Sequence, residues 1–172
     1  TLVASAGDYS MRLRLSTYRP ATLHDDDGLL QVPGYEDSFY YSRTRMRGTG
    51  ILVDGGKELR VDAQAWMDHQ WGAFVPVDIG WDWFSLQLED DTDLMLTVVR
   101  DATGAVVKKY GTLVAADGTV TGLGPTEFVV EATGSWTSPH TGAVYPSGWN
   151  VSVPAAGVSL GLVPVVMDSE FD

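Results

Sequence analysis

The sequence predicts an all-β protein of antiparallel strands, arranged as a sandwich or a barrel. Apolar and polar residues alternate with a period of two, which is typical of strands with one buried face. Turn-forming residues recur about every ten positions, the spacing expected of antiparallel sheets. No window combines an amphipathic helical pattern with helix caps.

The expected strands follow one another along the chain. The first alternates apolar and basic side chains over Met11–Leu15. A hairpin is expected over residues 51–63, because the Asp54-Gly55-Gly56 turn supplies the positive φ angles that tight hairpins need. Further strands are expected at residues 81–88, 94–99, 106–114, 119–120, 128–130, 149–153 and 158–163.

Three segments interrupt this series. Residues 18–35 are polar and are expected to form a long loop. Residues 72–80 link two Trp-rich strands and are a candidate domain junction. Met167–Asp172 ends the chain without a closing strand signal, so we expect the chain to be part of a longer polypeptide.

Composition narrows the function classes. Among 172 residues, 11 Lys and Arg against 23 Asp and Glu give a net charge of −12, which argues against nucleic acid and anionic membrane surfaces as partners. Hydrophobic residues make up 44%, enough for a core. Cysteine is absent, which excludes disulfides, thiolate metal ligands and a Cys nucleophile. Without cysteine, the sequence does not indicate the redox state of the compartment in which the protein lies. No apolar run approaches the roughly 20 residues of a transmembrane helix.

The central motif is Trp66-Met67-Asp68-His69-Gln70-Trp71-Gly72, in a region that holds four of the six Trp residues. On a strand, Trp66, Asp68 and Gln70 share one face, and Met67, His69 and Trp71 share the other. If Asp68 faces an apolar cavity, desolvation raises its pKa and the protonated form becomes a general acid. Aromatic walls would stabilise a cation formed from the substrate. The alternative is that these Trp side chains are ordinary core.

Two other motifs flank this one. In residues 39–46, Tyr41, Arg43 and Arg45 alternate with Tyr40, Ser42 and Thr44. They predict a cationic face that could pair with Asp68 or with other acids, or a solvated face. In residues 81–88, Trp81, Trp83, Ser85 and Gln87 share one face, which resembles a pocket wall with a polar anchor or an ordinary core strand.

A fourth motif, residues 134–149, is expected to be a structured loop whose aromatic side chains cover a barrel mouth or pack a connection. Other chemistries lack support. His24, His69 and His140 lie in no metal-ligand spacing, and the acidic turns do not match a calcium-binding loop. The sequence contains no G-x-S-x-G elbow and no nucleotide-binding glycine motif, so we expect neither a metal nor a cofactor.

These motifs, in this order, resemble the AttH and carotenoid 1,2-hydratase (hydroxyneurosporene synthase) family of lipocalin-like proteins. The resemblance covers residues from about Phe39 to Asp172 and is most specific over Trp66–Gly72. It implies an antiparallel lipocalin-like (calycin) β-barrel with parts of two barrel halves. Residues 1–74 would hold the later strands of the first β-domain, and residues 75–172 the earlier strands of the second. Complete members are about twice as long.

The resemblance also implies an activity. Carotenoid hydratases of this family add water to a terminal isoprenoid double bond without a redox cofactor, and their acidic residue matches Asp68. Our leading hypothesis is therefore a hydratase or dehydratase of an apolar isoprenoid- or polyketide-like alkene. Asp68 would be the acid and His69 or Gln70 would handle water. The residues expected to bind the small apolar substrate are Tyr41, Trp66, Trp71, Trp83 and Gln87. The alternatives are a pericyclic or cyclising enzyme and a non-catalytic lipid-binding module.

Overall fold

The computed structural model describes residues 1–75 and 77–171. These residues form antiparallel strands in three sheets and one short 3-10 helix, which confirms the expected all-β fold. The chain divides into two compact units, residues 1–122 and residues 123–172, which are described separately. No helix among the described residues has the length and hydropathy that a membrane span requires.

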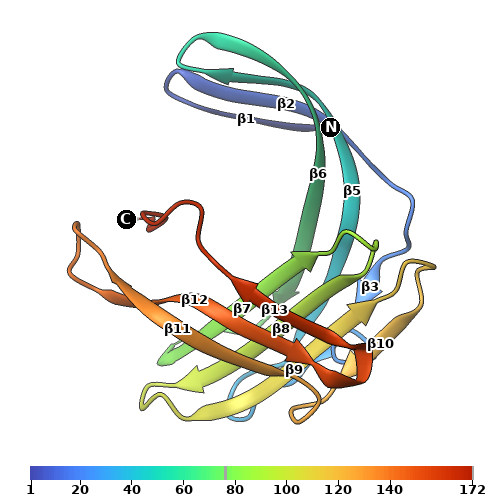
Figure 1. Ribbon diagram of the computed structural model, residues 1–172, viewed down its shortest axis with the longest axis vertical. Helices are drawn as coiled ribbons and strands as arrows, with labels where there is room; N and C mark the ends of the chain where they lie inside the picture. The colour runs from blue at the N-terminus through green and yellow to red at the C-terminus, as the bar shows by residue number, and fades with distance from the viewer. Residues whose placement is uncertain (76, 172) are drawn as a thin grey trace. The chain divides into compact units, whose positions relative to one another are not determined.

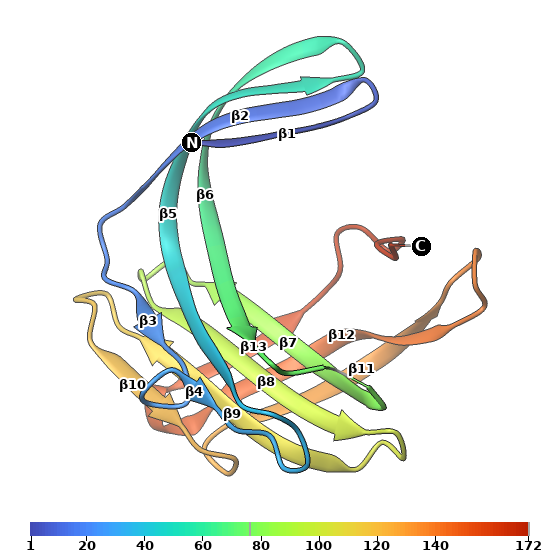
Figure 2. The ribbon, with the colours of Figure 1, turned by 180° about the vertical axis from the view of Figure 1, so that it is seen from behind.

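The first sheet is built on one long hairpin, formed by β5 (Ser38–Asp54) and β6 (Lys57–Gly72). Positive φ angles at Gly55 and Gly56 close its turn, as the sequence predicts. The hairpin is much longer than the predicted 51–63 and curves as a ribbon through the first unit (Figure 1). It carries β1 (Leu2–Ala6) and β2 (Tyr9–Thr17) near its turn, as Figure 2 shows from behind.

The opposite end of this hairpin pairs with two short strands. They are β3 (Thr22–Leu23) and β4 (Leu29–Leu30), both antiparallel to β5. The expected loop over residues 18–35 is therefore partly wrong, because the segment is tied to the sheet at these two points. Both strands are only two residues long, too short to show an alternation in the sequence.

A β-bulge divides β5 into two parts. Arg43 pairs with Met67 and Met46 pairs with Ala65, so two residues of β5, Thr44 and Arg45, lie opposite one residue of β6. The extra residue reverses the alternation, and Thr44, Arg45 and Met46 are all buried. The expectation that Arg43 and Arg45 form one cationic face is therefore wrong.

The second sheet of this unit has the order β10-β9-β8-β7. Its strands are β7 (Ile79–Gln87), β8 (Asp93–Asp101), β9 (Val106–Val114) and β10 (Val120–Leu123). Seven successive residues of β8, 93–99, are buried, which explains its nearly continuous apolar sequence. Its side chains Met95 and Val99 share a core cluster with Leu30 of β4 and Tyr40 of β5, so this sheet packs against the β4–β5 end of the first.

An ionic cluster lies buried in the same unit. The Asp93 carboxylate accepts hydrogen bonds from Arg19 Nη1 at 2.6 Å and from Arg45 Nε and Nη2 at 3.0 and 2.8 Å. Arg45 also donates to Asp91 Oδ1 and to the Leu88 carbonyl. Burial opposes the charge of Arg45, but hydrogen bonding to Asp93 raises its pKa. The cluster joins the segment after β2, the bulge of β5 and the start of β8.

The second unit contains a three-stranded sheet of the order β11-β12-β13. Its strands are β11 (Val129–Thr137), β12 (Val144–Val153) and β13 (Val158–Leu162), with the 3-10 helix η1 (Pro154–Ala156) before the last. The fourth motif was expected to be a loop, and this is wrong. It forms the β11–β12 hairpin, in which the cross-strand neighbours Trp136 and Tyr145 stack with ring centroids 6.0 Å apart.

The expected domain boundary at residues 74/75 falls between the first two sheets, after Gly72 and before Ile79. Both sheets belong to the compact unit 1–122. The assignment of residues 1–74 and 75–172 to two lipocalin-like domains stays a prediction.

Candidate functional site

A cavity of about 270 Å³ lies in the first unit, between the β5–β6 ribbon and the four-stranded sheet. Its walls are mostly apolar and aromatic, and they include Trp81 and Trp83 of β7 and Tyr110 of β9. Asp68 is the one lining residue with a carboxylate, and Gln70 adds an amide. Few polar groups in an apolar hollow are the usual composition of a small-molecule site.

The alternation along β6 places the central motif on two faces. Asp68 and Gln70 line the cavity, as their shared parity predicts. His69 and Trp71 lie on the other face of the ribbon, where their rings are 4.7 Å apart. Tyr41 is the cross-strand partner of His69 and lies on that same face, 5.5 Å from the His69 ring. The structure therefore does not bring Tyr41, His69 and Trp71 to the cavity.

The other two residues that were predicted to contact the substrate, Trp66 and Gln87, support the fold and do not line the cavity. Trp66 packs against the core cluster, edge-on to Trp83 at 6.5 Å between ring centroids, and it does not line the cavity. Gln87 donates from its amide to the carbonyl oxygens of Thr44 and Ala65, at 2.7 and 3.4 Å. Thr44 lies in the bulge and Ala65 lies next to it on β6, so Gln87 bonds to backbone carbonyls where the pairing of β5 and β6 is irregular.

Asp68 is held by two hydroxyl groups that sequence reasoning did not assign to the site. Tyr40 donates to Asp68 Oδ1 at 2.8 Å, and Ser42 donates to the same oxygen. Trp83 Nε1 in turn donates to the Tyr40 hydroxyl at 3.0 Å. Among the described residues, Asp68 Oδ2 has no hydrogen-bond partner. One oxygen of the carboxyl group is thus saturated and the other is available.

The side chains next to Asp68 carry no positive charge, and Tyr40 is neutral. Burial, and after it the charge of Asp68, raises the pKa of Tyr40 well above its ordinary value, so Tyr40 stays a neutral donor. No Arg or Lys in the described part of the chain pairs with Asp68. Arg43 donates to the Arg19 carbonyl at 3.1 Å, and Arg45 belongs to the ionic cluster. Pairing of this segment's cations with Asp68 is therefore wrong, whereas the alternative of pairing with other acids holds for Arg45, which pairs with Asp93 and Asp91.

Behind Ser42 lies His24, which the sequence analysis connected with no site. Its Nε2 is 2.6 Å from Ser42 Oγ, and its Nδ1 is 2.9 Å from Thr112 Oγ1. A serine beside a histidine could suggest a hydrolase, but Ser42 is fully buried and donates its hydroxyl hydrogen bond to Asp68. The pairing of Ser42 with Asp68 across β5 and β6 follows from the register, which a sequence pattern does not reveal.

Gly72 ends the central motif for a steric reason. Its φ is +150°, and a Cβ there would lie 2.7 Å from the Asp37 carbonyl oxygen and 2.9 Å from Ser38 Cα. We expect Gly72→Ala to destabilise the protein by about 1–3 kcal/mol, measured by urea unfolding. Gly80→Ala is the matched control, because a Cβ at Gly80 meets nothing within 4 Å. Equal unfolding midpoints for the two variants would contradict this explanation.

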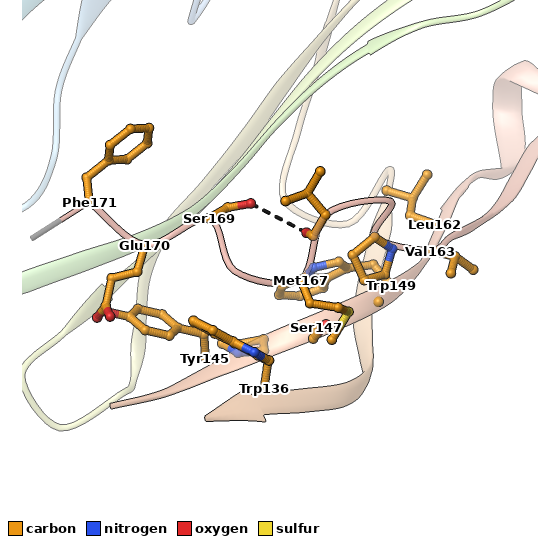
Figure 3. A pocket seen from close by; sticks show the side chains of 14 residues that line it. Trp136, Tyr145, Ser147, Trp149, Leu162, Val163, Met167, Ser169, Glu170 and Phe171 are labelled. Carbon is orange, nitrogen blue, oxygen red and sulfur yellow. Dashed lines mark hydrogen bonds between the residues drawn. The ribbon is translucent and has the colours of Figure 1, made fainter. Parts of the chain in front are cut away.

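A second cavity, of about 540 Å³, lies in the unit 123–172. Figure 3 shows Trp136, Tyr145 and Trp149 of the β11–β12 hairpin along it, with Met167 and Glu170 from the segment after β13. The Glu170 carboxylate accepts hydrogen bonds from the hydroxyls of Ser138, Thr141 and Tyr145, which lower its pKa. Glu170 is half-buried and both of its carboxylate oxygens accept hydrogen bonds, so it lacks the available oxygen that distinguishes Asp68.

The comparisons with known proteins give the same family as the sequence motifs. A family model described as AttH-like matches residues 1–172. The chain belongs to the AttH-like family. This confirms the family that the motif order predicts. No curated protein matches the chain.

Two solved structures share the fold of this AttH-like chain. A protein described as AttH, from Nitrosomonas europaea, is 26% identical with a TM-score of 0.88, over 99% of this chain and 54% of its own. Kievitone hydratase from Nectria haematococca is 18% identical with a TM-score of 0.69, over 87% of this chain and 47% of its own. The chain therefore spans about half the length of these two proteins.

Proposed function

We propose that this chain carries the acid site of a hydratase, or of the reverse dehydratase, that acts without a cofactor on an apolar isoprenoid- or polyketide-like alkene. The observation that carries the proposal is Asp68, whose exposed side chain lines an open, aromatic-walled pocket with one carboxyl oxygen saturated and the other available. Membership of the AttH-like family supports it, and one protein of the same fold is named a hydratase.

The proposed reaction balances with Asp68 alone as acid and base. Asp68 Oδ2–H gives its proton to one alkene carbon, and the π electrons form the new C–H bond. A cation remains on the other carbon, where the faces of Trp81 and Trp83 stabilise it through their ring quadrupoles. Water then forms the C–O bond and returns a proton to the Asp68 carboxylate. Nothing is oxidised or reduced, so the step needs no redox partner.

Gln70 is the candidate for placing the water. Its amide nitrogen donates to Ser38 Oγ at 2.8 Å, which fixes the side chain and leaves the amide oxygen as an acceptor. Trp83 forms part of the wall, while Trp66 supports Trp83 from behind. His69, Tyr41, Trp71 and Gln87 have no part in this proposal, because they do not line the cavity.

The test is turnover in water labelled with ¹⁸O, with a panel of isoprenoid and polyketide alkenes and mass detection of the products. Hydration predicts one ¹⁸O atom in each product. An unlabelled isomer of the substrate would instead identify a cyclising enzyme. A ligand that is retained unchanged, with no product from any alkene, would identify a binding module. Either of these two results overturns the proposal.

A further inference from the structure

The buried side chain of His24 is the feature that the proposed reaction does not yet use. It is fully buried and bonded at both ring nitrogens, to Ser42 and to Thr112. We propose that His24 is a positioning residue that acts through Ser42 and directs the acidic proton of Asp68 to the oxygen that is available in the cavity. This inference rests on the proposed function for its effect on turnover, whereas its structural content concerns the free protein.

The loop that carries His24 is fixed to β5. The His24 amide donates to the Tyr40 carbonyl at 3.2 Å, and the Tyr40 amide donates to the Gly28 carbonyl at 2.8 Å. The His24 ring also packs on the Tyr40 ring, with centroids 4.3 Å apart. At the next residue, Asp25 forms an ion pair with Lys108 of β9 at 2.5 Å. The imidazole is therefore held from both sheets of the first unit.

His24 is neutral at physiological pH. Burial lowers its pKa to about 4, although the negative charge of Asp68 acts in the opposite direction. A neutral imidazole has one N–H donor and one acceptor nitrogen, so its two hydrogen bonds must run in a single direction. The imidazole can therefore transmit an orientation between Thr112 and Ser42.

The direction follows from Ser42. Its hydroxyl has one proton, which it donates to Asp68 Oδ1, so it must accept a hydrogen bond from His24 Nε2–H. His24 Nδ1 then accepts from the Thr112 hydroxyl. This direction also points the positive end of the N–H dipole toward the side of the Asp68 carboxylate, which is electrostatically favourable.

The consequence appears at Asp68. Oδ1 accepts one hydrogen bond from Ser42 and one from Tyr40, so a proton on the carboxyl group belongs on Oδ2. The opposite tautomer of His24 would make Ser42 donate to the ring. Asp68 would then have to donate from Oδ1 to Ser42, and its proton would be withdrawn from the cavity.

The test reads the tautomer of His24 directly, by long-range ¹H–¹⁵N correlation of the histidine rings in ¹⁵N-labelled protein. The expected result is a protonated Nε2 and an unprotonated Nδ1 at neutral pH, with the signal assigned by its absence in His24→Gln. A protonated Nδ1 overturns the inference. The tautomer is read in the unmodified protein and needs no known substrate, and His24→Gln serves only to assign the signal among the three histidines.

Turnover gives the second readout. His24→Leu removes the donor to Ser42, and we expect kcat to fall by about 10²-fold while KM changes little. His24→Gln keeps an N–H donor and is expected to restore part of the loss. A change in KM alone, or no difference between the two variants, would reduce His24 to a packing role. If no alkene is hydrated at all, the proposed function fails while the tautomer still decides this inference.

Discussion

Replacing Asp93 with Ala is expected to destabilise the protein by about 3–5 kcal/mol, because two buried guanidinium groups would lose their counter-ion. The side chain of Asp93 is fully buried, and those of Arg19 and Arg45 are 7% and 3% exposed. Since a domain of this kind is stable by only about 5–15 kcal/mol, a loss of this size leaves little margin. Urea unfolding followed by Trp fluorescence measures it.

The matched control for this variant is Asp62→Ala. Asp62 also pairs with an arginine, Arg47, but both side chains are exposed, at 58% and 65%. Water screens such a pair, so we expect the unfolding midpoint to change little. Similar losses for the buried and the exposed aspartate would show that the ionic cluster does not have the importance assigned to it.

Replacing Asp68 with Asn is expected to lower the rate of hydration by about 10²–10⁴-fold, the usual contribution of a general acid. In free energy this is about 3–5 kcal/mol of transition-state stabilisation. An Asn oxygen can still accept from Tyr40 and Ser42, so the hydrogen bonds at Oδ1 are preserved and only the transferable proton is lost. The measurement is the ¹⁸O-labelled product formed per unit time.

Asp62→Asn is the control for this second variant, because Asp62 lies on the same strand, pairs with Arg47 and does not line the cavity. It is expected to keep full activity. The Asp68→Asn variant is expected to bind the alkene still, because the aromatic wall is unchanged. Quenching of Trp fluorescence measures this binding. If Asp68→Asn hydrates its substrate as fast as the unmodified chain, the acid lies elsewhere.

Much of the fold could be predicted from the sequence because alternation and turns are local properties. The Asp54-Gly55-Gly56 turn and the buried strand β8 both follow from short patterns. The β11–β12 hairpin was predicted only at residues 128–130 and 149–153, because the first five residues of β12, Val144–Gly148, include Pro146 and Gly148 and do not have the pattern of a strand. Pro146 is tolerated there because β13 begins to pair with β12 only at Trp149.

The candidate site could be predicted only in part, for a different reason. Parity along one strand is enough to place Asp68 and Gln70 on one face. The partners of Asp68 depend on the register between β5 and β6 and, for His24, on a contact across 18 residues of sequence. Arg45 was misplaced because a bulge leaves no mark in a sequence that alternates on both sides of it.

Because of that bulge, the number of residues between Ser42 and Arg45 decides which side chains of β5 reach Asp68 and which reach Asp93, more than the types of those residues do. Before it, β5 directs Tyr40 and Ser42 to the acid, and after it the same strand delivers Arg45 to Asp93. Deleting one residue here would restore regular pairing and send one of these two sets to the wrong side. A shortened β5 could therefore keep either the hydroxyl groups that hold Asp68 or the ion pair of Arg45 with Asp93, but not both.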